Sequence, residues 1–155
     1  MSSLRVLKID YHVVHTRTRF PFRYGIASMS EVPHLFLCAE LEIDGKSSVG
    51  ISAEGLPPEW FTKIPEATPE EELSGMLGSI TQAASTAEPI DLHDSLFSFW
   101  QDLYRRQHEW SAENDIPPLL SQFGVSLVER AMIDAYCRAK DIPFAQSLAE
   151  NRFGI

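Results

Sequence analysis

The chain has 155 residues, 44% of them hydrophobic and 23% charged, which suits one soluble globular domain. Its formal net charge of −9 disfavours nucleic-acid binding, because basic residues do not cluster beyond pairs such as Arg105 and Arg106. No apolar run approaches membrane-spanning length, and the N-terminus has no apolar signal core. The two cysteines, Cys38 and Cys137, are expected as buried thiols, so we expect a cytoplasmic protein.

Alternating apolar residues predict three strands near the N-terminus. In residues 5–13 this pattern places four apolar side chains on one face: Leu7, Ile9, Tyr11 and Val13. The same period returns in residues 35–43 and 49–53. Between these two runs, Asp44 and Gly45 accept positive φ, so the second and third strands are predicted to form a hairpin.

The segment between the first two strands, residues 16–33, contains Pro21 and Gly25 and ends on a proline. It also carries four large apolar residues among basic ones: Phe20, Phe22, Tyr24 and Ile26. We expect a long loop here, with more aromatic residues than loops normally have.

Helical signals replace the strand pattern after residue 65. Thr68, Pro69 and Glu71 predict a capped helix start, followed by apolar residues at helical spacing. A second apolar stripe occupies residues 92–104, a third occupies residues 125–139, and residues 144–151 suggest one more short helix.

This order of elements predicts an α+β fold. It is a three-stranded antiparallel meander followed by a bundle of three to four helices. We expect one domain over residues 1–155, with residues 1–65 forming the sheet and two loops, and residues 66–155 forming the helical part.

Motifs for chemistry are weak. Residues 50–54 resemble a nucleophile elbow, but Glu54 replaces the final glycine. Asp91, His93 and Asp94 are expected at a helix start, where an acid more often caps the helix than binds metal. No glycine loop for phosphates occurs, so a nucleotide cofactor has no support. We predict no catalytic and no metal-binding residues in this chain.

Two features of the predicted helices favour structural roles. Glu129 and Asp134 are five residues apart, so they do not share a helix face, and we expect them to be solvated. Phe97, Phe99 and Trp100 are expected as core or interface residues rather than a ligand cage.

Two segments remain as candidate sites: residues 20–26 and residues 56–63. Both adjoin the predicted sheet and carry many large apolar residues. Either the domain buries these residues in its own core, or they form a hydrophobic lid.

Residues 52–63, after the predicted hairpin, and residues 124–135, in a late helix, resemble the N-terminal capping domain of the enolase superfamily, in the mandelate racemase and muconate lactonizing branch. The resemblance covers nearly the whole chain. It implies that residues 19–26 and 50–63 are specificity loops that close over the mouth of a catalytic barrel. That barrel, typically about 250 residues long, would follow Ile155 and is absent.

The resemblance implies that the complete enzyme, an isomerase or lyase, abstracts the proton α to a carboxylate with help from magnesium. The acid–base residues and magnesium ligands of this family belong to the barrel, so none can be placed on this chain. The chain would instead supply a lid over the substrate, with apolar walls and with Arg23 or Lys63 meeting the substrate carboxylate. The implied lid residues are Phe20, Phe22, Arg23, Tyr24, Ile26, Leu56, Trp60, Phe61 and Lys63.

The implied partners are a (β/α)8 barrel, in the same or another polypeptide, and a carboxylate substrate. A capping domain without its barrel exposes apolar surface, so we also expect a homo-oligomer. The alternative is a stand-alone α+β module whose aromatic loops hold a small molecule or a protein. On either interpretation, the chain alone is expected to lack activity.

Overall fold

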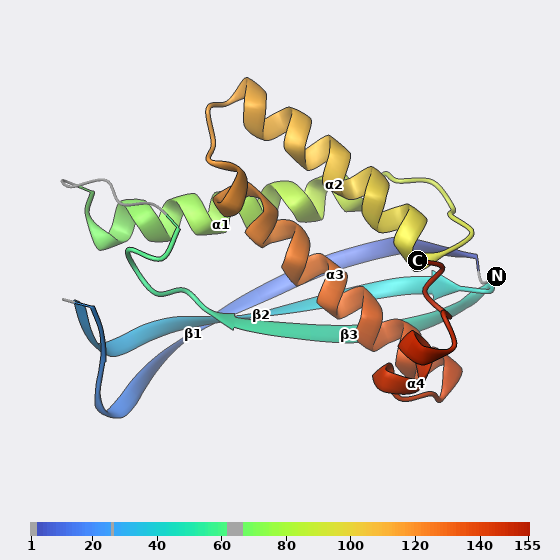
Figure 1. The fold of residues 1–155 in the computed structure, drawn as a ribbon, viewed down its shortest axis with the longest axis horizontal. Helices are drawn as coiled ribbons and strands as arrows, with labels where there is room; N and C mark the ends of the chain where they lie inside the picture. The colour runs from blue at the N-terminus through green and yellow to red at the C-terminus, as the bar shows by residue number, and fades with distance from the viewer. Residues whose placement is uncertain (1–2, 26, 62–66) are drawn as a thin grey trace.

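The structure is a computed structural model that describes residues 3–25, 27–61 and 67–155 (Figure 1). Its strands form one antiparallel sheet in the order β1-β2-β3: β1 (Leu4–Tyr24), β2 (Ala27–Ile43) and β3 (Lys46–Gly55). The described helices follow: α1 (Pro69–Ala87), α2 (Leu96–Glu113), α3 (Pro118–Lys140) and α4 (Phe144–Ala149). The predicted α+β meander with a helical part is therefore confirmed.

The turn between β2 and β3 forms as predicted. Asp44 and Gly45 have φ values of 50° and 77°, and the flanking residues Ile43 and Lys46 pair directly. A two-residue turn with positive φ at both positions matches the twist of an antiparallel hairpin.

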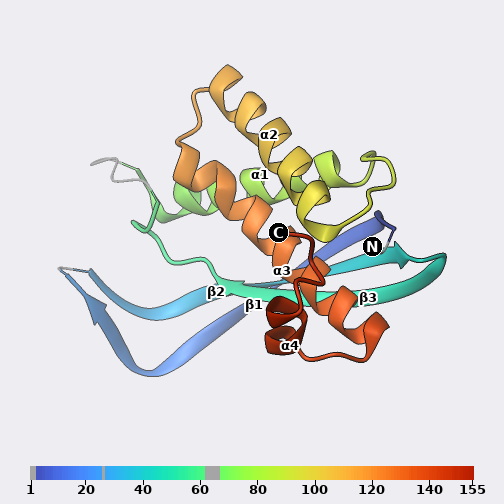
Figure 2. The ribbon, with the colours of Figure 1, turned by 45° about the vertical axis from the view of Figure 1, so that its right-hand side comes forward.

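The helices cover one face of the sheet (Figure 2). The residues of β2 that point toward them alternate along the strand and are at most 2% exposed: Leu35, Leu37, Ala39, Leu41 and Ile43. They join a single core with apolar residues of α1, α2 and α3. The strand alternation thus sets which face of the sheet the helices bury.

The start of β1 differs from the prediction. Leu4 and Val6 are buried, whereas Leu7 is 41% exposed. Val6 pairs with Leu41, and Lys8 pairs with Glu40, which is adjacent to Leu41 in β2. Leu7 is therefore the extra residue of a β-bulge. The prediction that Leu7 shares a face with the buried Ile9 is wrong, because the bulge shifts the period of the strand by one residue.

The predicted loop over residues 16–33 is also wrong. Thr16 pairs with Val32, and after a register shift Phe22 pairs with Met29, so β1 and β2 continue as a long hairpin. Pro21, which cannot donate to a ladder, falls in the unpaired stretch of this register shift and does not end the hairpin. We call residues 16–31 the arm; in Figure 1 its described part bends away from the helical layer.

The helix starts follow local chemistry. At α1 the Thr68 hydroxyl accepts a hydrogen bond from the Glu71 amide at 3.3 Å, and the Glu71 carboxylate accepts one from the Thr68 amide at 2.8 Å, confirming the predicted cap. At α2 the cap is Ser95 rather than an acid, so the expected capping role of Asp91 or Asp94 is wrong. The third helix starts at Pro118, before the predicted stripe.

Two glycines allow α3 to approach its neighbours closely. A Cβ on Gly50 of β3 would lie 2.0 Å from the Ala131 carbonyl oxygen of α3. A Cβ on Gly124 of α3 would lie 2.2 Å from the Ser79 carbonyl oxygen of α1. Neither distance is possible for real atoms, so both contacts require glycine.

Carboxylates of α3 and of the residue after α1 accept hydrogen bonds from the two edge strands of the sheet. Asp134 of α3 accepts a hydrogen bond from the Ile51 amide of β3 at 2.9 Å, and Glu88 accepts one from the Ile9 amide of β1 at 2.9 Å. These contacts satisfy edge amides that could otherwise pair with another strand. Asp134 therefore has a structural partner, which corrects the expectation that it is merely solvated.

Two expectations from composition are also answered. Cys38 and Cys137 are free thiols, each partly buried rather than fully buried. Within the described ranges, no helix combines the length and apolar character needed to span a bilayer.

Candidate functional site

The arm and the segment after β3 lie at the same end of the molecule (Figure 1). We call residues 56–61 the post-β3 loop. The arm, this loop and the start of α1 surround a hollow of about 970 Å³. Each of the three contributes polar residues to its lining, among them Thr16, Arg17, Glu31, Glu59 and Glu70. Its size is that of a site for a small organic ligand.

The tip of the arm presents exposed aromatic residues. The side chains of Phe20 and Phe22 are 75% and 56% exposed, and Arg23 is also exposed. None of these residues lines the hollow. The tip therefore projects its apolar surface beyond the hollow, where a second protein surface could cover it.

The post-β3 loop is anchored at both ends and exposed between them. Leu56 is 2% exposed and belongs to the core. The ring centroid of Phe61 lies 4.5 Å from that of Phe123 on α3. Trp60, between these anchors, is 59% exposed. Of the three, Trp60 alone offers a largely exposed side chain as a wall for a ligand.

A second cleft, of about 330 Å³, lies on the other side of the post-β3 loop. Trp60 and Phe61 line it together with Met76, Ile116 and Leu120. Four acidic residues also line it: Glu59, Glu71, Glu72 and Asp115. Hydrogen bonds from Thr68 hold the pKa of Glu71 below its usual value, so Glu71 is ionised at neutral pH. We call this the acidic cleft.

The predicted lid residues thus occupy separate places. Leu56 borders the hollow, Trp60 and Phe61 border the acidic cleft, and the residues of the arm tip border neither. Tyr24 ends β1 and pairs with Ala27 through the backbone. Ile26 and Lys63 lie outside the described residues.

Sequence reasoning missed the polar lining of the hollow. Arg17 and Glu31 face each other across the arm and form an ion pair, and Glu70 stands in the first turn of α1. No local signal indicated this lining, because residues 16–19 have no apolar alternation and Pro21 and Gly25 favour a loop.

Among the described residues, no group of three or more His, Cys, Asp or Glu side chains could hold a metal ion. The acidic residues of the cleft do not form such a group. The described part of the chain therefore does not fit the magnesium site of a complete enzyme.

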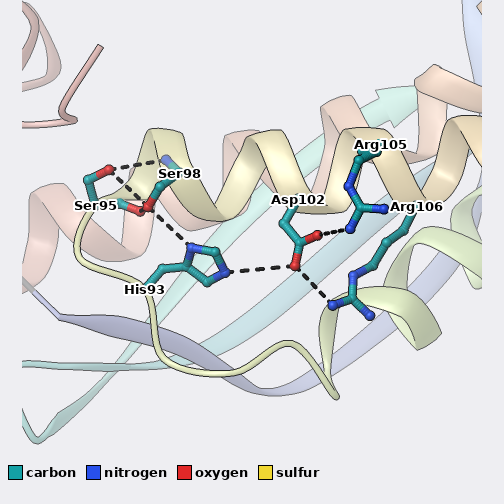
Figure 3. A network of polar contacts seen from close by, with 6 residues as sticks. All are labelled: His93, Ser95, Ser98, Asp102, Arg105 and Arg106. Carbon is teal, nitrogen blue, oxygen red and sulfur yellow. Dashed lines mark hydrogen bonds and ion pairs between the residues drawn. The ribbon is translucent and has the colours of Figure 1, made fainter.

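A serine, a histidine and an aspartate meet at the start of α2 (Figure 3). The Ser98 hydroxyl lies 3.2 Å from Nδ1 of His93, and Nε2 of His93 lies 3.8 Å from the Asp102 carboxylate. The second distance is too long for the hydrogen bond that orients histidine in a catalytic triad. The Ser98 hydroxyl also donates to the Ser95 carbonyl at 3.0 Å, within the first turn of the helix.

This network has a structural explanation. The backbone of His93 exchanges two 2.9 Å hydrogen bonds with Leu4, and its ring packs edge-on against the buried Phe99. Asp102 accepts hydrogen bonds from Arg106 and Arg105, which hold its pKa below the usual value despite partial burial. The network joins the start of β1 to α2, and we assign it no catalysis.

Glu129 is the one described carboxyl for which burial is the leading cause of a raised pKa. It borders a small pocket of about 190 Å³ with Phe97, Trp100 and Ile133, and accepts a hydrogen bond from Trp100. The expectation that it is fully solvated is wrong, because Trp100 and the C-terminal segment cover it.

No protein-family model and no curated relative matches the sequence. Among solved structures, the chain is similar to an enolase with bound magnesium from the alpha proteobacterium BAL199, with a TM-score of 0.63, 17% identity, and coverage of 94% of this chain and 34% of that one. An enolase from Bradyrhizobium complexed with magnesium and mandelic acid is similar with a TM-score of 0.60 and 15% identity, and the match covers 95% of this chain and 35% of that one. A mandelate racemase/muconate lactonizing enzyme-like protein from Rubrobacter xylanophilus is similar with a TM-score of 0.60 and 17% identity, and the match covers 92% of this chain and 33% of that one.

At these identities the similarity shows the fold. The chain spans about a third of the length of the solved structures it matches. The resemblance inferred from residues 52–63 and 124–135 is confirmed at this level. The chain has the fold of a part, about one third, of enolase and mandelate racemase/muconate lactonizing proteins, without a barrel.

Proposed function

We propose that residues 1–155 are the capping and substrate-specificity domain of an enzyme similar to mandelate racemase and muconate lactonizing enzyme. A (β/α)8 barrel would be supplied in the same polypeptide or by another chain. The observation that carries this proposal is the placement of two segments with exposed aromatic residues, the arm tip and the post-β3 loop, at one end of the fold, where other residues of the arm and of this loop line one hollow. The fold similarity supports the same interpretation.

The reaction class proposed for the complete enzyme is removal of the proton α to a carboxylate. The described residues of this chain do not fit magnesium, so the metal and the base would reside on the barrel. The contribution of this chain would be enclosure. Closing a lid excludes water, which strengthens the electrostatic interactions between the substrate and the groups around it.

In this proposal Phe20, Phe22 and Trp60 form apolar walls over the substrate, and Arg23 meets its carboxylate. Trp60 is suited to this role because it is 59% exposed on a loop whose ends are held by Leu56 and Phe61. A loop fixed in this way presents its exposed side chain at low cost in conformational entropy. Tyr24, Ile26 and Lys63 enter the proposal through the family resemblance alone.

The first test is to isolate the protein from its source cell with an antibody against this chain. We expect a species that contains a barrel, either covalently or as a bound subunit, and that exchanges the α-proton of carboxylic acids with solvent only when magnesium is present. A 17.5 kDa species without a barrel partner would overturn the proposal and favour a stand-alone module.

Variants of that isolated assembly test the lid itself. Trp60→Ala is expected to lower kcat/KM roughly tenfold or more, because a wall of the closed site is lost. The free energy of unfolding should change by less than about 0.5 kcal/mol, as for other exposed positions. Leu92→Ala is the matched control, since Leu92 is 55% exposed outside both segments. Equal kcat/KM for both variants would show that Trp60 is not part of the lid.

A further inference from the structure

The arm is basic within an acidic chain. Residues 16–31 contain three arginines and one acid, whereas the whole chain has a formal net charge of −9. Arg17 is paired with Glu31 across the arm. Arg19 and Arg23 are exposed and form no ion pair with any residue in the described ranges. The tip therefore carries two cations available to a partner.

The same tip carries aromatic surface. Phe20 stands next to Arg19 and is 75% exposed, and Phe22 stands next to Arg23 and is 56% exposed. Exposed aromatic rings favour a surface that buries them. Alternation of aromatic and basic residues specifies a complementary surface: an apolar floor with a negatively charged rim.

The acidic cleft has this composition. Its floor consists of apolar side chains that include Phe61, Met76 and Leu120, and its volume of about 330 Å³ admits an aromatic ring. Glu59 and Asp115, both exposed, stand among the four acidic residues on its lining. No Lys, Arg or His is found among its described lining residues, so the charge of the arm tip and that of the cleft are complementary.

Within one molecule the arm and the acidic cleft are kept apart. The post-β3 loop lies between them, because Glu59 borders the acidic cleft on one side and the hollow next to the arm on the other. The arm and the start of α1 nevertheless occupy the same end of the molecule in both views (Figures 1 and 2). Two molecules placed end to end could therefore each reach the cleft of the other.

We propose that two copies of this chain associate by reciprocal docking, in which the arm of each copy places Phe20, Arg19 and Arg23 in the acidic cleft of the other. The same two surfaces are used twice, so the contact is related by a two-fold axis and closes at a dimer. The interface uses residues of this chain alone. An arm docked in this way cannot also cover a substrate on a barrel, so we propose this dimer for the chain when no barrel is bound.

The test is the mass of the purified chain in solution, measured by sedimentation from micromolar to submillimolar concentration. We expect a dimer that weakens as salt is raised, because exposed charge pairs are screened. Reversal of the arm charges in Arg19→Glu with Arg23→Glu should raise the dissociation constant roughly tenfold or more. Reversal of three cleft charges in Glu59→Lys with Glu72→Lys and Asp115→Lys, which leaves Glu71 as the remaining acid among the described lining residues, should do the same.

Mixing the double arm variant with the triple cleft variant provides the decisive result. Each variant alone presents like charges at both contacts, but a mixed pair presents opposite charges at both, so heterodimers should form when neither variant self-associates. Arg5→Glu with Lys46→Glu is the matched control for the arm variant, because it makes the same change in net charge at exposed positions outside the arm and the cleft. A wild-type monomer throughout the concentration range would overturn the proposal. So would a dimer that survives both reversals, or a mixture that stays monomeric while circular dichroism shows folded variants.

Discussion

The two halves of the β1–β2 hairpin are both antiparallel, with a register shift between Arg17 and Phe22 in the arm, but their environments differ. Near the β2–β3 turn, helices cover one face of the strands, and Leu37 and Leu41 are fully buried. In the arm, Phe20 and Phe22 of β1 are more than half exposed. Ladder hydrogen bonds therefore suffice to extend the hairpin, while burial against helices supplies the stability of the domain. The arm is left free for contacts with another molecule.

The strongest test of this difference is a matched pair of truncations in the two halves. Leu37→Ala should lower the free energy of unfolding by about 3 kcal/mol, because it removes a fully buried side chain and leaves a cavity. Phe20→Ala should change it by less than about 0.5 kcal/mol, although more apolar atoms are removed. Urea unfolding at low protein concentration measures both values without a contribution from self-association.

If Phe20→Ala destabilised the monomer as much as Leu37→Ala, the arm would be an integral part of the core. The comparison between the two halves would then be incorrect.

The second test concerns how the helices fit on the sheet. Gly124→Ala places a methyl group 2.2 Å from the Ser79 carbonyl oxygen, so α1 and α3 must separate. We expect a loss of about 2 kcal/mol in the free energy of unfolding. Gly78→Ala, in α1, is the control: no atom lies within 4 Å of the new methyl group, so higher helix propensity should stabilise the protein by up to about 1 kcal/mol. Similar effects for the two variants would show that the helices tolerate wider spacing.

The same two regions show what the sequence can predict. Residues 35–43 keep a regular period because one face is buried along its length, and both the strand and its face were predicted correctly. The arm has no buried face, so its residues obey no such constraint, and Pro21 and Gly25 indicate a loop. Backbone pairing with β2 overrides that local signal, since a hairpin already started can extend without a hydrophobic pattern.

The candidate site was predictable only in part. Composition alone pointed to the exposed Phe20, Phe22 and Trp60, because large apolar residues in loops are unusual. It could not separate Leu56, which enters the core, from Trp60, which does not. The acidic cleft combines the post-β3 loop and α1 with residues 115–117 and Leu120 of α3, which lie far along the chain from them, so no local pattern could predict it.

The smallest expected effect is on the pH dependence of unfolding. It compares Glu129, a partly buried carboxyl of the helical layer, with Glu31, an exposed carboxyl of the arm. Burial raises the pKa of Glu129, so its ionised form is disfavoured in the folded state. Below the unfolded pKa of about 4.3, Glu129 is protonated in both states and its burial carries no charge penalty. As the pH rises through the folded pKa, the carboxyl must ionise while covered, and the folded state loses stability relative to the unfolded state. Glu129→Gln should therefore be more stable than the wild type at pH 7, with an advantage that disappears as the pH falls toward about 4.

Glu31→Gln on the arm is the control for this prediction. Its ion pair with Arg17 is exposed, so its removal should cost at most about 1 kcal/mol and should not stabilise the protein at any pH. Urea midpoints for both variants between acid and neutral pH measure the difference. A Glu129→Gln protein less stable than the wild type at pH 7 would mean that the hydrogen bond from Trp100 to the carboxylate outweighs the cost of covering the charge. The helical layer would then tolerate a buried charge as readily as the arm tolerates an exposed one.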